Sequence, residues 1–448
     1  MSRVLNDSDP MIRELAIWAL GGVGGDVAVK SLSETLQNGQ SWREQALAAV
    51  SLGRIGTDRA VARLLQFHKD LEGTQYADYI EVAVIWALGR SGNAQAAPVL
   101  AQALAHTSDD VAAVAAWGLA QVSTPAAIAS LFDGYWGSDP RIRQRAARGL
   151  VQAAIPASSL PRDRRRIDEI RKEIKLVNER DKVFDVEGIL KGLSQAASVV
   201  TVPRDASAFI RKHAETIAAA AKRAVIARPE RVLSDIVSAD ARLRLGHITG
   251  GRANDNEVEA MTAIARELLA EVRPVAANKG PAQTTALTFL AAAGEQADAA
   301  AIATLLGDSD REVRAAAALA AGYVGDSTMT KPLRTALADD WYGVRANAAA
   351  SLGILLKGSK DTGATTQLLP LLDEDFGSVQ VAAAQALGRI GSPSAVQPLQ
   401  ERLLSATVPT MVACVYALRQ IGGPQADSVL ERMQRHPDPR VREAATSK

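Results

Sequence analysis

The sequence IRELAIWALGGVG at residues 12–24 ends in the motif that decides the fold. This motif, Ala-Leu-Gly-x-x-Gly, begins at Ala19 and returns as ALGRSG at Ala87 and ALGRIG at Ala386. A close copy is SLGRIG at Ser51, and weaker copies read GLAQVS, GLVQAA, AAGYVG, SLGILL and ALRQIG. We align the copies on the leucine and call this position the anchor. The anchors are Leu20, Leu52, Leu88, Leu119, Leu150, Leu290, Ala321, Leu352, Leu387 and Leu418.

The anchors recur with a nearly constant spacing. Six of the eight steps within the two series are 31 or 32 residues long, and the other two are 35 and 36. The long steps contain the polar insertions LEGTQYADY and KGSKDTGATT. A fixed period of this size predicts a stack of helical units, because each unit buries its apolar side only against its neighbours.

Each repeat predicts a pair of helices. An acidic turn such as NDSDP, GSDP, GDSD or HPDP opens the repeat and offers side-chain oxygens that cap a helix. Apolar residues then follow at helical spacing, and Gly21 and Gly24 are expected to end the first helix. A shorter helix follows, for example VAVKSLSETL. We therefore predict an all-α, right-handed α-solenoid without β-sheet. In the first repeat the expected buried stripe is Ile12, Ala16, Ala19, Leu20 and Val23.

The repeat resembles the HEAT-like repeat of the phycobilisome-lyase type. The resemblance rests on the acidic turn, the Val313-Arg314 and Val441-Arg442 pairs, an alanine-rich run and the Leu-Gly-x-x-Gly end. It covers residues 1–154 and 280–448 and implies an α-solenoid. It also suggests phycobilin-lyase activity, or a subunit of such an enzyme, as an alternative to a binding role. Many unrelated functions occur on this fold, so the resemblance does not select one.

Composition limits the classes of function. Apolar residues make up 47% of the chain and aromatic residues only 4%, so small aliphatic side chains must build the core. The net charge of +1 provides no general attraction to nucleic acid or to an anionic membrane. Cys414 is the single cysteine, which excludes a disulfide within the chain and fits a cytoplasmic protein. The sequence contains neither an apolar signal core nor a run long enough to span a membrane.

Residues 155–279 interrupt the repeat and divide the chain into three predicted parts, 1–154, 155–279 and 280–448. We interpret the middle part as longer, degenerate helix pairs within the same solenoid, with an inserted helical domain as the alternative. It contains basic residues interleaved with acidic ones, which is typical of a solvated helix. Contact with nucleic acid is the second alternative function. The basic residues are Arg162, Arg164, Arg165, Arg166, Arg171, Lys172 and Lys175.

The sequence predicts no catalytic, metal or cofactor site. Its histidines are dispersed, none forms a His-Glu dipeptide, and glycine-rich GHITGGRAN has no strand before it. Deoxyhypusine hydroxylases, which share this repeat type, use His-Glu pairs as iron ligands, so that activity is not expected. An arginine lies seven residues before several anchors, and we expect it to pair with a nearby aspartate. The arginines are Arg13, Arg143, Arg314 and Arg345, and the candidate partners are Asp9, Asp139, Asp310 and Asp340.

The two ends suggest an incomplete array. The anchor that would follow Arg442 falls one residue beyond Lys448, and no polar capping helix precedes the first repeat. Solenoids usually have polar caps, so we expect a longer chain or a larger assembly. In that case Val441, Ala444 and Ala445 should be exposed.

Tryptophans mark the predicted binding site. Trp18, Trp86 and Trp117 each lie two residues before an anchor, and Val50 takes this place in the intervening repeat. At about 100° per residue, this position points almost opposite to the predicted buried stripe. Aligned repeats would then form an exposed apolar ridge, which is typical of a contact surface. We therefore predict a non-catalytic scaffold that binds a protein partner through Trp18, Val50, Trp86 and Trp117.

Overall fold

A computed structural model describes residues 4–71, 77–154, 177–178, 183–197, 206–233 and 263–446. The chain divides into two compact units. The first contains Met1–Ala224 and Asn254–Ile264, and the second contains Val225–Ala253 and Ala265–Lys448. The three-part division at residues 154 and 279 stays a prediction.

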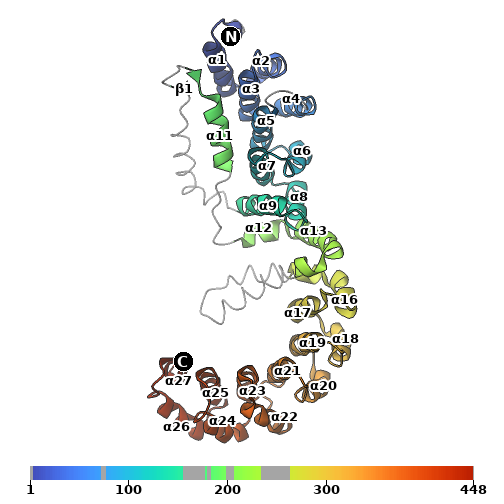
Figure 1. Ribbon diagram of the computed structural model, residues 1–448, viewed down its shortest axis with the longest axis vertical. Helices are drawn as coiled ribbons and strands as arrows, with labels where there is room; N and C mark the ends of the chain where they lie inside the picture. The colour runs from blue at the N-terminus through green and yellow to red at the C-terminus, as the bar shows by residue number, and fades with distance from the viewer. Residues whose placement is uncertain are drawn as a thin grey trace. The chain divides into compact units, whose positions relative to one another are not determined.

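The first unit begins with five helix repeats arranged in two rows (Figure 1). The anchor-bearing helices pack side by side in sequence order, α1 against α3, α3 against α5, α5 against α7 and α7 against α9. These first helices are α1 Pro10–Val23, α3 Trp42–Ile55, α5 Ala77–Ser91, α7 Asp109–Val122 and α9 Pro140–Ala153. The second row consists of α2 Gly25–Asn38, α4 Asp58–Lys69, α6 Ala97–Ala103 and α8 Pro125–Tyr135, with short 3-10 turns η1 Val4–Asn6 and η2 Ala94–Ala96.

The part of the chain after α9 departs from the repeat. Two short antiparallel strands, β1 Val177–Asn178 and β2 Val183–Phe184, precede helix α11 Val186–Ala197. This hairpin corrects the expectation that no β-sheet would occur, although the all-α class holds. Helices α12 Ser207–Lys212 and α13 Ala214–Ala227 follow. The basic residues between Arg162 and Lys175 lie outside the described residues.

The second unit repeats the two-row arrangement (Figure 1). Its first helices are α17 Gln283–Ala293, α19 Arg311–Val324, α21 Tyr342–Leu355, α23 Gly377–Ile390, α25 Val408–Ile421 and α27 Pro439–Thr446. The other row is α16 Leu269–Ala277, α18 Ala299–Leu305, α20 Thr330–Ala336, α22 Thr362–Leu368, α24 Val396–Arg402 and α26 Pro424–Met433. Short 3-10 turns are η4 Gln296–Asp298, η5 Ser327–Met329, η6 Leu369–Asp373 and η7 Pro393–Ala395.

The acidic turns start the first helices as the sequence predicts. The carboxylate of Asp9 accepts the Met11 amide at 2.9 Å, and that of Asp310 accepts the Glu312 amide at 2.8 Å. Such caps satisfy amides that have no partner within the helix. At the other end, the last glycine of the motif lies just beyond the helix, and Gly391 adopts a left-handed conformation there.

The first glycine of the motif has a different role from the one expected. Gly21 lies inside α1, which continues to Val23, so it does not end the helix. A Cβ placed on Gly21 would lie 2.7 Å from the Cβ of Ser51 on α3, and one on Gly353 would lie 2.6 Å from the Cα of Ala386. The missing side chain therefore allows successive first helices to approach closely.

The anchors form the core of both arrays. Leu20, Leu52, Leu88, Leu352 and Leu387 are all buried, which confirms the prediction. The stripe proposed for the first repeat is wrong at three positions, because Ile12 and Val23 are 38% and 66% exposed and Ala19 is exposed as well. That side of a first helix packs on the preceding first helix, and among the described residues α1 has no such neighbour.

The last helix also differs from its prediction. Val441, Ala444 and Ala445 are buried, not exposed. Helix α27 packs on α25, and the Arg419 guanidinium of α25 donates to the Ala444 carbonyl at 2.5 Å. One neighbouring repeat is enough to cover these small side chains. Among the described residues, no helix is long and apolar enough to cross a membrane.

Candidate functional site

We call the arginines seven residues before the anchors, Arg13, Arg143, Arg314 and Arg345, the arginine ladder. They form ion pairs and hydrogen bonds, but most of their partners are not the aspartates that the sequence suggested. Arg314 binds Asp339 and Asp340 of the next repeat at 2.7 and 2.6 Å. Arg345 binds Glu374 through two hydrogen bonds of 2.8 and 2.6 Å. Each pair connects one repeat to the following one, so these charges serve the stacking of the array.

The remaining predicted pairs need correction. Arg13 binds Glu44 of the next repeat at 2.9 Å, while Asp9 caps its own helix. Arg143 donates to the carbonyls of Gly137 and Ser138, and Asp139 also caps its own helix. Both aspartates accept backbone amides at the start of their own helices.

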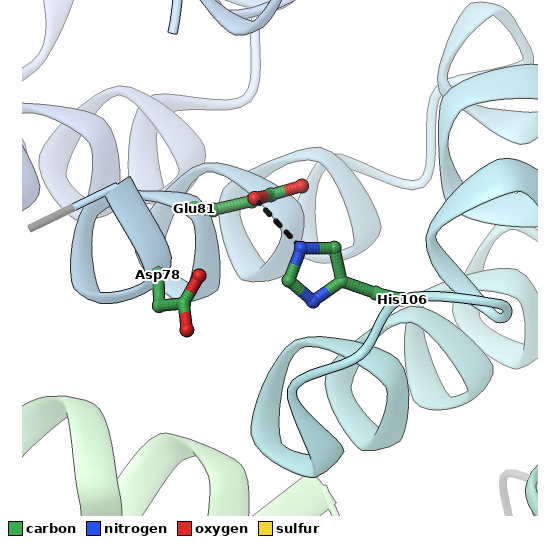
Figure 2. A group of neighbouring side chains, drawn as sticks. All are labelled: Asp78, Glu81 and His106. Carbon is green, nitrogen blue, oxygen red and sulfur yellow. Dashed lines mark ion pairs between the residues drawn. The ribbon is translucent and has the colours of Figure 1, made fainter. Parts of the chain in front are cut away.

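A cluster of histidine and carboxylate side chains lies between α4, α5 and α7. Glu81 occupies the position where other repeats carry the ladder arginine, and Figure 2 shows His106 pointing toward it. The Nε2 atoms of His106 and His68 lie 3.3 and 3.4 Å from the two carboxylate oxygens of Glu81. His106 stands 13 residues before its anchor, where Asp339 and Glu374 stand in their repeats. The contact between Glu81 and His106 therefore corresponds to an ion pair of the arginine ladder, with the acidic residue in the place of the arginine and the basic residue in the place of its carboxylate partner.

The hydrogen bond at the other ring nitrogen of His106 decides what this cluster can hold. Asp78, Glu81 and His106 each offer one atom within 4.8 Å of the others, a donor set suited to a divalent metal. However, the Ser108 amide donates to His106 Nδ1 at 3.0 Å, so the proton of the neutral ring resides on Nε2. A metal on Nε2 would move that proton to Nδ1, where it would face the Ser108 amide proton. The geometry favours a hydrogen-bonded pair over a metal site.

The same turn explains why a histidine stands at this position. Asp308 and Asp339 accept the amide two residues later at 2.8 and 2.9 Å. His436 accepts the Asp438 amide through Nδ1 at 3.1 Å, as His106 does for Ser108. Histidine thus replaces aspartate as the acceptor of the turn. We interpret the cluster as part of the scaffold.

The predicted tryptophan ridge is less exposed than expected. We call the surface around Trp18, Val50, Trp86 and Trp117 the tryptophan face. Val50 is only 1% exposed, and the three indoles are half-buried against the core of the first unit. The guanidinium of Arg54 lies 4.4 Å from the Trp18 ring, and the rings of Trp86 and Trp117 stack 6.1 Å apart. Helices α3, α5 and α7 each have a neighbouring first helix on both sides, which one buried stripe did not anticipate.

Helix α11 of the same chain packs on three of the first helices. It lies beside α3, α5 and α7 (Figure 1). Its Val186, Ile189 and Leu190 join their buried core. The Ser194 hydroxyl donates to Asp110 of α7 at 2.5 Å. Asp110 precedes Trp117 by seven residues, which is about two helical turns, so both lie on the same side of α7. Helix α11 is therefore attached on the side of α7 that carries Trp117.

The sequence analysis missed α11. The run VEGILKGLSQAA has apolar residues at helical spacing, which was the signal available. It has no glycine-ended motif and belongs to no anchor, so alignment on the repeats passed over it. The residues on its buried side are Val186, Ile189, Leu190 and Ala197.

The family follows from comparison with known repeats. The model of HEAT repeats matches residues 1–77, 73–151, 276–353, 299–379 and 365–447, which is more than half of the chain. The chain belongs to the HEAT-repeat family. The matched ranges cover the two repeat series and leave out the part that contains α11. No curated protein matches this HEAT-repeat sequence.

This chain is similar to several solved structures at low sequence identity. The karyopherin Kap121p bound to the extreme C-terminus of the protein phosphatase Cdc14p is 13% identical, with a TM-score of 0.46. That match covers 98% of this chain and 52% of the karyopherin, so this chain spans about half of that structure's length. A designed armadillo repeat protein is 21% identical over 42% of this chain and 91% of its own, with a TM-score of 0.28. Human deoxyhypusine hydroxylase is 15% identical, covers 91% and 98% of the two chains and has a TM-score of 0.25.

Proposed function

We propose that this HEAT-repeat protein is a non-catalytic scaffold that binds a protein partner on the tryptophan face of its first unit. The observation that carries the proposal is that this face accommodates a helix. Helix α11 rests on α3, α5 and α7 and shares their apolar core. A surface that buries one amphipathic helix has the shape and chemistry to bind another.

A comparison of equal positions in the two arrays supports this choice of surface. Two residues before the anchor, the first unit has three tryptophans and Val50, and only α9 differs. The second unit has no tryptophan at these positions, and its one aromatic side chain there, Tyr416, is 43% exposed. Tryptophans gathered on one array alone are typical of a binding surface. The residues of the second unit are Thr288, Leu319, Ala350, Gln385 and Tyr416.

The absence of catalysis is part of this proposal. The arginines of the ladder are engaged by carboxylates of neighbouring repeats, and the cluster at Glu81 is bound within itself. Both sets of charges therefore have a structural role. We also propose a cytoplasmic location and no nucleic-acid partner, on the basis of the single cysteine and the balanced charge. The phycobilisome-lyase subtype of the repeat likewise stays a proposal based on the Leu-Gly-x-x-Gly pattern.

Quantitative capture of partners from native extract by the full chain tests the proposal. The variant W86A/W117A removes the stacked indole pair of the face, and Y323A/Y416A removes two exposed aromatic side chains of the second unit as a matched control. We expect the first variant to lose at least one partner by tenfold or more while the control retains it. Equal capture by wild type and W86A/W117A, with helicity unchanged, would refute the role of this face.

A further inference from the structure

Helix α11 is placed like a bound ligand and unlike a repeat helix. The repeat helices pack beside their neighbours in sequence order, whereas α11 contacts α3, α5 and α7 from 64 or more positions away. We propose that the tryptophan face is a docking surface for an amphipathic helix, that α11 occupies it in cis, and that a partner helix of the same pattern competes with α11. This inference rests on the proposed function and adds the kind of partner and its regulation.

The dimensions and ends of α11 show that it lies across the first helices. Its 12 residues make a helix of roughly 18 Å at about 1.5 Å per residue. Three neighbouring helices whose axes are about 8–10 Å apart span about the same length. Strand β2, which precedes α11, contacts α1, and the Gln152 side chain of α9 donates to the Ala197 carbonyl at 2.6 Å. The helix therefore runs along the stack of repeats, as a bound peptide helix would.

The buried side of α11 defines the pattern that a partner must match. Val186, Ile189, Leu190 and Ala197 are buried, while Glu187, Lys191 and Gln195 of the same helix are exposed. Leu193 of the same helix also packs against this core, so apolar residues recur three, four, seven and eleven positions after Val186. The exposed side of the helix is polar, so the partner helix must be amphipathic.

A polar contact fixes the position of α11 along the surface on which its apolar side packs. Ser194, eight residues after Val186, donates to Asp110 Oδ1 at the start of α7. A carboxylate at this point selects a helix with a hydrogen-bond donor next to its apolar side. It also disfavours a helix with an acidic residue there, because two carboxylates would repel each other. The partner is therefore an amphipathic helix with a hydroxyl or basic side chain at the position of Ser194.

Binding of a synthetic peptide of residues 183–199 to the full chain tests the inference. The variant I189D/L190D places two charges on the buried side of α11 and should release it from the face, and K191E changes an exposed residue of α11 as the control. We expect the fluorescent peptide to bind I189D/L190D at least tenfold more tightly than wild type or K191E. A peptide carrying the same two aspartates should not bind. Equal binding to wild type and I189D/L190D, or no binding to a folded I189D/L190D chain, would overturn the proposal.

A second variant tests the same point without disturbing the core. In D110C/S194C, a disulfide would hold α11 on α7, and the native Cys414 is buried and does not interfere. The oxidised form should exclude the peptide and the reduced form should admit it. Peptide binding to both forms alike would contradict the placement of α11. Neither experiment uses the native partner, so partner capture that is independent of the face would refute the proposed function and leave this result standing.

Discussion

The hydroxyl of Ser194 donates a 2.5 Å hydrogen bond to the carboxylate of Asp110, across 84 positions of sequence. This bond links α11 to the first turn of α7. We expect Asp110→Ala to weaken the attachment of α11 while the repeats stay folded, because the repeats do not depend on this bond. Amide hydrogen exchange within α11 should become several-fold faster, in line with about 1 kcal/mol for a hydrogen bond.

The neighbouring residue provides the control for this prediction. Asp109 pairs instead with Arg145 of α9, at 2.5 Å. Asp109→Ala should therefore change exchange in α9 and leave that in α11 unaltered. If both variants change α11 to the same extent, the Ser194 bond is not its specific attachment.

The close approach of the first helices predicts that alanine substitutions at two glycines have opposite effects on stability. Gly353→Ala would press a methyl group against Ala386, and overpacking of this kind costs about 1–3 kcal/mol. Gly377→Ala meets nothing within 4 Å, in a helical conformation. It should be neutral or stabilise the fold by up to about 1 kcal/mol, because alanine restricts the unfolded chain. Thermal unfolding of both variants checks the prediction, and equal midpoints would contradict it.

The arginine ladder predicts that an ion pair between repeats contributes more to the free energy of unfolding than an ion pair within one turn. Arg345 is mostly buried and holds Glu374 through two hydrogen bonds, so Arg345→Ala should lower the free energy of unfolding by about 1.5–3 kcal/mol. Arg440 binds Asp438 two residues away and is exposed. Arg440→Ala should leave the unfolding midpoint unchanged. Denaturant titration of the two variants measures the difference, and the reverse order would exclude a stacking role for the ladder.

The pair at Glu81 predicts a loss of stability in acid. Burial raises the pKa of Glu81, but the hydrogen bond from His68 and, once the two rings are protonated in acid, the charges of His106 and His68 outweigh it and hold the pKa below its usual 4.5. A depressed folded-state pKa stabilises the protein above the unfolded value, and this contribution is lost as the pH falls through the folded value. Glu81→Gln should therefore flatten the fall in unfolding midpoint below about pH 4.5. An unchanged acid profile would contradict the contribution of Glu81.

The tautomer of His106 predicts how the cluster responds to metal. Nitrogen NMR should show the proton on Nε2 and the lone pair on Nδ1, because Nδ1 accepts the Ser108 amide. Zinc in excess should then leave the unfolding midpoint unchanged. A higher midpoint with zinc that disappears in Glu81→Ala would show that the cluster binds metal after all.

The repeats could be predicted from the sequence because their cause is local. The anchor, the acidic turn and the final glycine recur at fixed spacing, and each acts within one helix or on the next one. Contacts between repeats were harder to predict, and Gly21 is an example. The sequence suggested that Gly21 ends α1, but its missing side chain instead lets α1 approach Ser51 of α3. The burial of Val50 could not be predicted from α3 alone, because α3 packs between α1 and α5. Helix α11, which also contacts α3, comes from a distant part of the chain. A single-helix pattern contains none of this information.

Hydrogen exchange of the unmodified full chain tests the central claim most directly. The claim is that α11 occupies the tryptophan face as a separable ligand of the array. The amides of α11 should exchange at least about a hundredfold faster than those of α7 at equal intrinsic rates, because α11 can leave while the repeats stay folded. If the amides of α11 and α7 exchange at the same rate, α11 opens only with the whole array. That result would make it a structural part of the fold and contradict the account.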